Sequence, residues 1–156
     1  MLKQCLLIAA MIISDYSFAH NSAGDVLDQY HQSAASADYD AYFATIDEKA
    51  ILLGTDGSER WTKEAFKAYV KPYFNKGRGW TYKVMQRNLT TVKADEVMFF
   101  DELLSNDAYG NCRGTGVLVK TNDGWKILQY NLSVVVPNDI SSSVVKTIKK
   151  FRQLTP

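Results

Sequence analysis

Three charged residues in the C-terminal half of the chain are candidates for acid–base or anion-binding chemistry. Asp101 and Glu102 are neighbours in an apolar segment, and Arg113 follows beyond a turn at residues 106–110. If the two segments pair as antiparallel strands, one carboxylate must share a face with Arg113, because side chains alternate along a strand. Such a pair could bind an anion or a carbonyl group and supply a general base in a pocket. Facing outward, it would instead be a structural bridge across a dimer, and the turn at 122–124 is compatible with both orientations.

The remaining reactive side chains form no recognisable catalytic or metal-binding pattern. If cleavage left His20 at the N-terminus, its amine and imidazole could chelate copper together with His31. His31 lies in a helical segment and would have to fold back over the chain start, so we predict a surface histidine, no metal site and no cofactor. Cys112 is the only cysteine after residue 19. With no histidine near it in the sequence, it is expected to be a buried strand cysteine rather than a nucleophile.

The composition and the first residues limit the class of protein. The chain has 156 residues and a formal net charge of +1, which predicts one domain and gives no electrostatic basis for binding nucleic acid. Residues 1–19 combine a short basic start, an apolar run and small residues before His20, the pattern of a cleaved signal peptide. We therefore expect a secreted or periplasmic protein whose single domain is residues 20–156. No other segment is apolar enough for a membrane span.

The spacing of apolar residues predicts helices first and strands later. The segment 50–53 is expected to be a short buried strand, and Thr62 is expected to cap a helix in which Trp61 packs on Phe66. Pro72 should bend or end that helix. The loop before it, Gly54–Arg60, is interpreted as a hinge with Glu59 and Arg60 as a surface pair. The expected helices are 23–37, a short one from 38, 62 to about 74 and 139–151, and the expected later strands are 80–89, 97–105, 112–120 and 125–136.

Short turns between the long strands predict an antiparallel meander and hence an α+β fold. Along the last strand, alternation places Gln129 and Asn131 on the face of Trp125 and Ile127. That face turns polar midway, as expected for a pocket with a few fixed hydrogen-bonding groups. Tyrosines and Trp61 could line such a pocket. The candidate pocket residues are Tyr30, Trp61, Tyr69, Asp101, Arg113, Gln129 and Asn131.

The order of elements and several segments resemble the nuclear transport factor 2-like, or SnoaL-like, superfamily. The segments are GTDGSERWTKEAFKAYVKPYF, KGRGWTY, FFDELL, CRGTGVLVK and WKILQYNLSVVVPND, and they look like a bacterial secreted branch. The resemblance covers nearly the whole chain after residue 19. It implies a cone-shaped fold, in which a strongly curved antiparallel sheet wraps around the N-terminal helices and a helix follows at the C-terminus.

The resemblance also carries expectations about function. The base carboxylate of ketosteroid-isomerase-like members falls at Gly54 in this chain, which favours ligand binding over catalysis. We therefore expect a domain that binds a small, mainly apolar molecule. The alternatives are an isomerase or hydratase using Asp101 or Glu102 as base, and a non-catalytic dimeric assembly module. Superfamily members commonly dimerise through the back of the sheet, which here is expected to carry Leu128, Tyr130, Leu132 and Val134.

Overall fold

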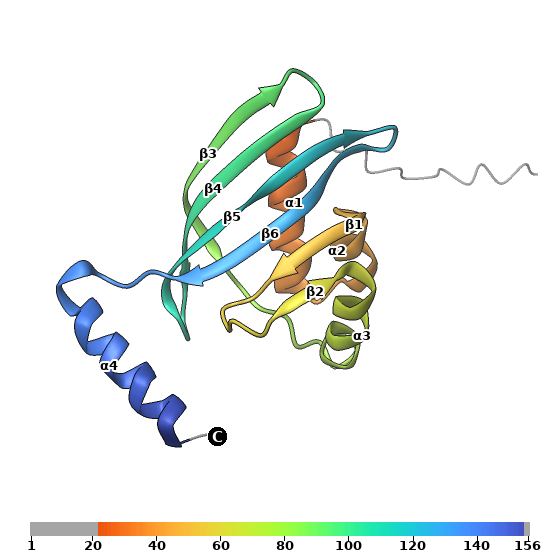
Figure 1. The fold of residues 1–156 in the computed structure, drawn as a ribbon. Helices are drawn as coiled ribbons and strands as arrows, with labels where there is room; N and C mark the ends of the chain where they lie inside the picture. Colours follow the sequence, from red (N-terminus) through yellow and green to blue (C-terminus); the bar gives the residue numbers. More distant parts are fainter. Residues whose placement is uncertain (1–21, 155–156) are drawn as a thin grey trace, which may run out of the picture.

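The computed structural model describes residues 22–154, and they form an α+β fold in which helices cover one face of a curved sheet (Figure 1). The predicted signal peptide lies outside the described residues. The elements are α1 Ala23–Ser36, α2 Tyr39–Ala44, β1 Ile46–Leu53, β2 Arg60–Thr62, α3 Lys63–Phe74, β3 Lys83–Lys93, β4 Val97–Asn106, β5 Gly110–Thr121, β6 Gly124–Val134 and α4 Asn138–Leu154.

The six strands form one sheet in the order β2-β1-β6-β5-β4-β3. The meander from β3 to β6 is antiparallel, as predicted, whereas β1 joins β6 in parallel. Strand β1 begins at Ile46, earlier than predicted, and the unpredicted strand β2 forms a hairpin with it. The loop Gly54–Arg60 is therefore a hairpin turn rather than a strand-to-helix hinge.

Local capping explains where the helices begin and end. Ser22 and Asp25 form a reciprocal capping box at the start of α1, and Thr62 caps α3 by accepting a hydrogen bond from the Ala65 amide. Helix α3 continues only two residues beyond Pro72, so the predicted early end is confirmed.

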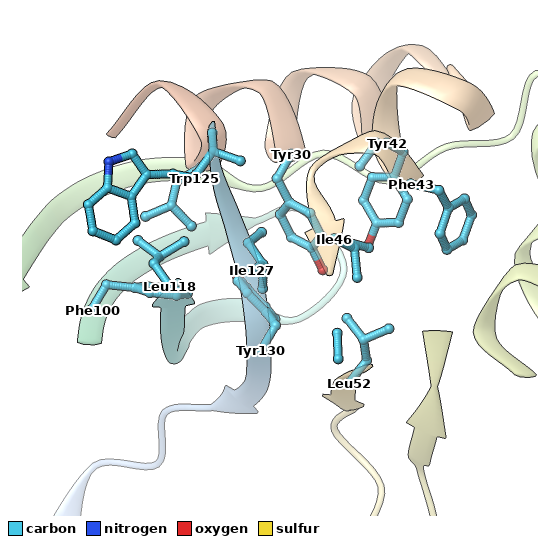
Figure 2. Packing of buried hydrophobic residues seen from close by; sticks show 14 of the residues in the cluster. Tyr30, Tyr42, Phe43, Ile46, Leu52, Phe100, Leu118, Trp125, Ile127 and Tyr130 are labelled. Atoms are coloured by element: carbon cyan, nitrogen blue, oxygen red, sulfur yellow. The ribbon is translucent and has the colours of Figure 1, made fainter. Parts of the chain in front are cut away.

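The core lies between the concave face of the sheet and helices α1 to α3 (Figure 2). Val26, Leu27 and Tyr30 of α1 are buried against Phe100, Leu118 and Ile127 of the sheet. Tyr42 of α2 is fully buried and its ring contacts those of Tyr30, Phe74 and Trp80. The centre of this core is therefore unusually rich in aromatic rings.

A β-bulge overturns the predicted faces of β6. Leu118 pairs with Ile127 but Val117 pairs with Gln129, so Leu128 is an extra residue in β6. Beyond the bulge the alternation is reversed: Tyr130 is buried and Gln129 is exposed. Tyr130 and Leu132 thus lie on the inner face rather than on the back of the sheet, and the polar residues Gln129, Asn131 and Ser133 take the outer face.

Helix α4 extends away from the sheet beyond the end of β6 (Figure 1). Ile140, Val145 and Ile148 are all about half exposed, at 44–51%. Among residues 22–154, no helix is long and apolar enough to cross a membrane.

We predict that a chain ending at Pro137 keeps its fold. Because the side chains of α4 bury little surface, the free energy of unfolding should change by less than about 1 kcal/mol. Urea unfolding of the full and shortened chains would measure this change. A loss of several kcal/mol would show that α4 packs on the domain in solution.

Candidate functional site

A pocket of about 190 Å³ opens between α1, α3 and the sheet. Nine of its sixteen lining residues are aromatic, namely Tyr30, Tyr42, Trp61, Phe66, Tyr69, Trp80, Tyr82, Tyr109 and Tyr130. The polar lining is small and includes His31, Thr55 and Glu59. An apolar, largely aromatic cavity with a few fixed polar groups is typical of sites for small organic molecules.

The inner wall of the pocket is built from stacked tyrosines. The ring of Tyr30 lies 4.7 Å from that of Tyr42 and 4.8 Å from that of Tyr130. Burial, the largest effect, raises the pKa of all three phenols above their ordinary value. Burial also raises the pKa of Tyr82 to about 12. These phenols are therefore neutral hydrogen-bonding groups at physiological pH.

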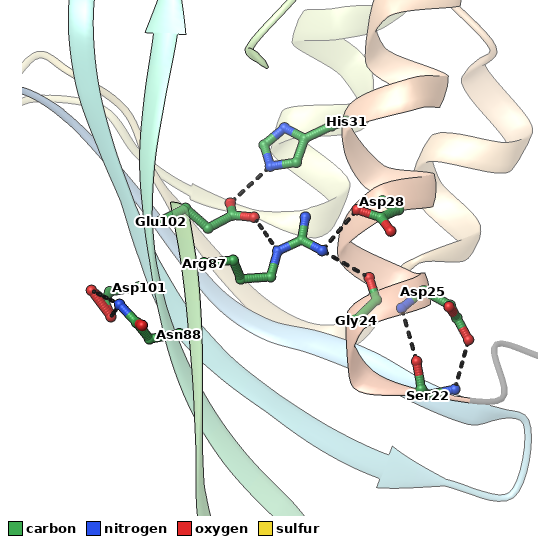
Figure 3. A network of polar contacts seen from close by, with 9 residues as sticks. All are labelled: Ser22, Gly24, Asp25, Asp28, His31, Arg87, Asn88, Asp101 and Glu102. Atoms are coloured by element: carbon green, nitrogen blue, oxygen red, sulfur yellow. Dashed lines mark hydrogen bonds and ion pairs between the residues drawn. The ribbon is translucent and has the colours of Figure 1, made fainter. Parts of the chain in front are cut away.

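His31 joins the pocket to a buried charge network (Figure 3). Its Nε2 lies 2.8 Å from Oε2 of Glu102, and the two side chains are 10% and 0% exposed. Because a carboxylate can only accept, Nε2 donates, and Nδ1 is an acceptor in the neutral ring. The carboxylate therefore fixes both the orientation and the tautomer of this histidine.

Arg87 neutralises Glu102 from the other side. Its Nε donates to Oε1 of Glu102 at 2.7 Å, and its Nη1 donates to Asp28 at 2.7 Å and to the Gly24 carbonyl at 3.2 Å. Burial opposes the charge of the guanidinium, but the hydrogen bonds to Glu102 and Asp28 outweigh it and raise the Arg87 pKa. Both oxygens of Glu102 are thus occupied, one by a cation and one by His31.

The residues predicted for the site are distributed over both faces of the sheet. Tyr30, Trp61 and Tyr69 line the pocket, whereas Asp101, Arg113, Gln129 and Asn131 do not. Arg113 is exposed and pairs across the sheet with Leu103, and Asp101 accepts hydrogen bonds from the Asn88 amide. The expected ion pair of Arg113 with Asp101 or Glu102 is therefore not found among the described residues, and Glu102 pairs with Arg87 of β3 instead.

Sequence reasoning missed three residues of the site: His31, Arg87 and Glu59. His31 is not a surface histidine: its side chain is only 10% exposed, and it follows the buried Leu27 by one turn of α1. Glu102 alternates with Phe100 and Leu104, both buried, which is a detectable sign of an inward carboxylate. No comparable signal marks Arg87 among the other cations of the strands.

Glu59 also has a different environment from the one predicted. Its carboxylate lines the pocket and accepts a hydrogen bond from the Asp56 amide at 3.1 Å, instead of pairing with Arg60. A Cβ on Gly54 would lie 2.0 Å from Oε2 of Glu59. The missing side chain at Gly54 therefore makes room for this carboxylate at the mouth of the pocket.

Metal ligands do not cluster in the part of the chain that the structure describes: no group of three or more His, Cys, Asp or Glu side chains could hold an ion between residues 22 and 154. His20 lies outside that range.

Cys112 is fully buried, and burial raises the pKa of its thiol. We predict that this thiol does not react with Ellman's reagent in the native protein and reacts fully in concentrated urea. A Cys5→Ser background would isolate the signal of Cys112. Rapid reaction of the native protein would show that the strand around Cys112 opens readily.

Comparison with known proteins identifies the family. Residues 24–137 match the SnoaL-like domain, and the chain belongs to this family. The fold is that of the nuclear transport factor 2-like superfamily, and α4 lies beyond the matched residues. No curated protein matches the sequence significantly.

The solved structures that share this fold include proteins of unknown function and a proposed enzyme. A cystatin-like domain of unknown function from Nostoc punctiforme has a TM-score of 0.65 and 12% identity, covering 83% of this chain and 88% of its own. A proposed scytalone dehydratase from Novosphingobium aromaticivorans has a TM-score of 0.62 and 11% identity, covering 72% and 81%. An NTF2-like protein of unknown function from Pseudomonas putida has a TM-score of 0.60 and 12% identity, covering 76% and 87%. Identities this low indicate a shared fold and carry no activity over.

Proposed function

We propose that this protein binds a small, flat, mainly apolar molecule in the aromatic pocket. The observation that carries the proposal is a pocket of about 190 Å³ whose lining is mostly aromatic and which opens to solvent beside Tyr69. Apolar surface gains free energy when it is removed from water, so an aromatic pocket open to solvent favours a ligand that covers its rings. A ligand with a planar ring would pack against the rings of Trp80, Tyr82 and Tyr130, which line the pocket.

His31 is the group best placed to recognise a polar substituent on such a ligand. Its ring lines the pocket, while Glu102 and Arg87 lie behind it. A preoriented hydrogen-bonding group adds specificity without the cost of ordering a mobile side chain.

The binding proposal can be tested with 2-naphthol, a planar probe with one hydroxyl group. Calorimetry should detect saturable binding to the wild type. A Leu132→Trp variant, which places a larger side chain on the pocket wall, should lose it while keeping its circular dichroism spectrum. Equal binding by the two proteins would place the probe elsewhere and refute the proposal for this pocket.

Acid–base catalysis is the second candidate, and the His31–Glu102 pair is the observation that favours it. A histidine held by a buried carboxylate is a recurrent arrangement for a general base. Glu102 itself, expected from the sequence as a possible base, is fully enclosed by its two partners. His31 would therefore make the contact with substrate and Glu102 would position it.

Proton abstraction next to a carbonyl can be followed without knowing the natural substrate. Nuclear magnetic resonance in D₂O would report deuterium exchange at the α-carbon of 1-indanone. Catalysed exchange that disappears in His31→Gln would support an enzyme. Exchange at the uncatalysed rate in the wild type would argue against this chemistry on aryl ketones.

We also propose that the protein is an exported homodimer, associated through the outer face of the sheet. The outward Phe99 of β4 is 50% exposed, and Leu128 at the bulge of β6 is partly exposed, with β5 lying between the two strands. Sedimentation of the wild type and of Phe99→Asp would test the association, with a dimer expected only for the wild type. The mass of the exported protein would test cleavage near His20. A dimer with an empty pocket would favour the assembly role over ligand binding.

A further inference from the structure

The electrostatic character of the aromatic pocket limits the class of ligand that it can bind, in addition to the limit set by its shape. The faces of tyrosine and tryptophan rings are electronegative, so a cavity lined by them attracts cations. At the mouth, the rings of Trp61 and Tyr69 stack with centroids 5.1 Å apart, and Tyr73 lies 5.5 Å from Tyr69. Tyr69 is 43% exposed, so this cluster is open to an incoming ligand.

Glu59 adds a formal negative charge to the same mouth. Its side chain is partly buried, it lines the pocket, and its Oε2 is held by the Asp56 amide. Burial raises the pKa of Tyr69, and the neighbouring Tyr73 and the negative charge of Glu59 raise it further. This is consistent with the Glu59 carboxylate lying near the Tyr69 phenol. Among residues 22–154, none of the ion pairs involves Glu59.

The rest of the pocket offers no opposing fixed cation. Within residues 22–154, no lysine or arginine lines it, and its buried phenols are neutral. Behind His31, the charge of Glu102 is balanced by Arg87 at 2.7 Å. Among the described residues that line the pocket, Glu59 is therefore the only acid, and no basic lysine or arginine opposes it.

We infer that the apolar molecule bound in the pocket carries a cationic group of the trimethylammonium type. The methylated ammonium group would lie against Trp61 and Tyr69 with Glu59 as its counter-charge, and the apolar part of the ligand would extend toward His31. A quaternary ammonium suits this site because its charge is weakly hydrated and its methyl groups pack on aromatic rings. The inference rests on the proposed binding function and specifies the ligand class for the same pocket.

The test compares choline with its uncharged isostere 3,3-dimethyl-1-butanol by calorimetry on the full chain. Choline should bind about tenfold more tightly, because only its charge makes cation–π contacts with the rings and pairs with the Glu59 carboxylate. Glu59→Gln should remove most of that preference without weakening the alcohol. The control Glu64→Gln, at an exposed acid on the neighbouring α3, should keep it.

Each other outcome is decisive. Equal affinity of the two probes for the wild type, with 2-naphthol still binding, would refute the cation inference and leave the proposed binding function intact. A preference that survives in Glu59→Gln would refute the role of this carboxylate. Failure of choline, the alcohol and 2-naphthol to bind would overturn the inference and the binding function together.

Discussion

Replacing Arg87 with methionine is expected to lower the free energy of unfolding by about 3 to 5 kcal/mol. The guanidinium is the cationic partner of Glu102, whose side chain is 0% exposed, and Nε lies 2.7 Å from its Oε1. Methionine fills a similar volume but leaves that carboxylate in the core with His31 alone. An uncompensated buried charge costs far more than the loss of a surface ion pair. Urea unfolding at neutral pH would measure the change.

Two further variants separate this network from a general effect of losing an arginine. Arg113→Met removes an exposed arginine from the outer face of β5 and should change stability by no more than about 0.5 kcal/mol. In the double variant Arg87→Met/Glu102→Gln, removal of the buried charge should restore much of the loss. A single Arg87→Met variant as stable as Arg113→Met would contradict the burial of Glu102.

Replacing Phe100 with alanine is expected to cost about 3 to 5 kcal/mol, the second large effect. The ring is 1% exposed and lies 5.8 Å from that of Tyr130. A Cβ on Gly116 would meet the same ring at 2.7 Å, which shows how closely β5 and the ring pack. Alanine would leave a void that such a tightly packed core can fill only in part.

The adjacent Phe99 supplies the matched control, because it has the same chemistry on the other face of β4. It is 50% exposed, and Phe99→Ala should cost no more than about 1 kcal/mol at concentrations where the chain is monomeric. Thermal and urea unfolding of both variants would give the comparison. If Phe99→Ala were the more damaging of the two, β4 would have to be shifted by one residue from the register described here.

Both predictions matter for function because they concern the wall that positions His31. Phe100, Glu102 and Leu104 point inward from successive alternate positions of β4. The strand thus supplies packing on either side of a single carboxylate, which reduces its freedom to move. A histidine hydrogen bonded to so rigid a partner keeps one orientation toward the pocket.

The helices, the meander and the α+β class were predictable from sequence because each depends on local patterns. The side chains of Ser22 and Thr62 cap helices α1 and α3. The turn at residues 122–124 contains the residues that a tight hairpin requires. The pocket residues Tyr30, Trp61 and Tyr69 could be predicted from the sequence because they lie on apolar stripes of helices or beside a helix cap.

The alternation of residues in the sequence could not predict which face of the sheet each side chain of β6 occupies. A strand pattern assigns faces only while its pairing stays in register, and one extra residue at Leu128 reverses every later side chain. Tyr130 and Leu132 therefore line the pocket, whereas alternation had placed them at the predicted dimer interface. Gln129 lies on the outer face of the sheet, whereas it was predicted to face the pocket.

By itself, the sequence determined the helices, the antiparallel meander from β3 to β6 and the α+β class, but not the hairpin of β1 with β2. Only the tertiary structure decided that His31 of α1, Arg87 of β3 and Glu102 of β4 meet, and that Glu59 occupies the space left by Gly54. The physical reason is the distance along the chain over which each feature arises. Caps and periodicity depend on neighbours a few residues apart, whereas a buried charge network depends on side chains up to 71 residues apart that meet only when the sheet closes over the helix.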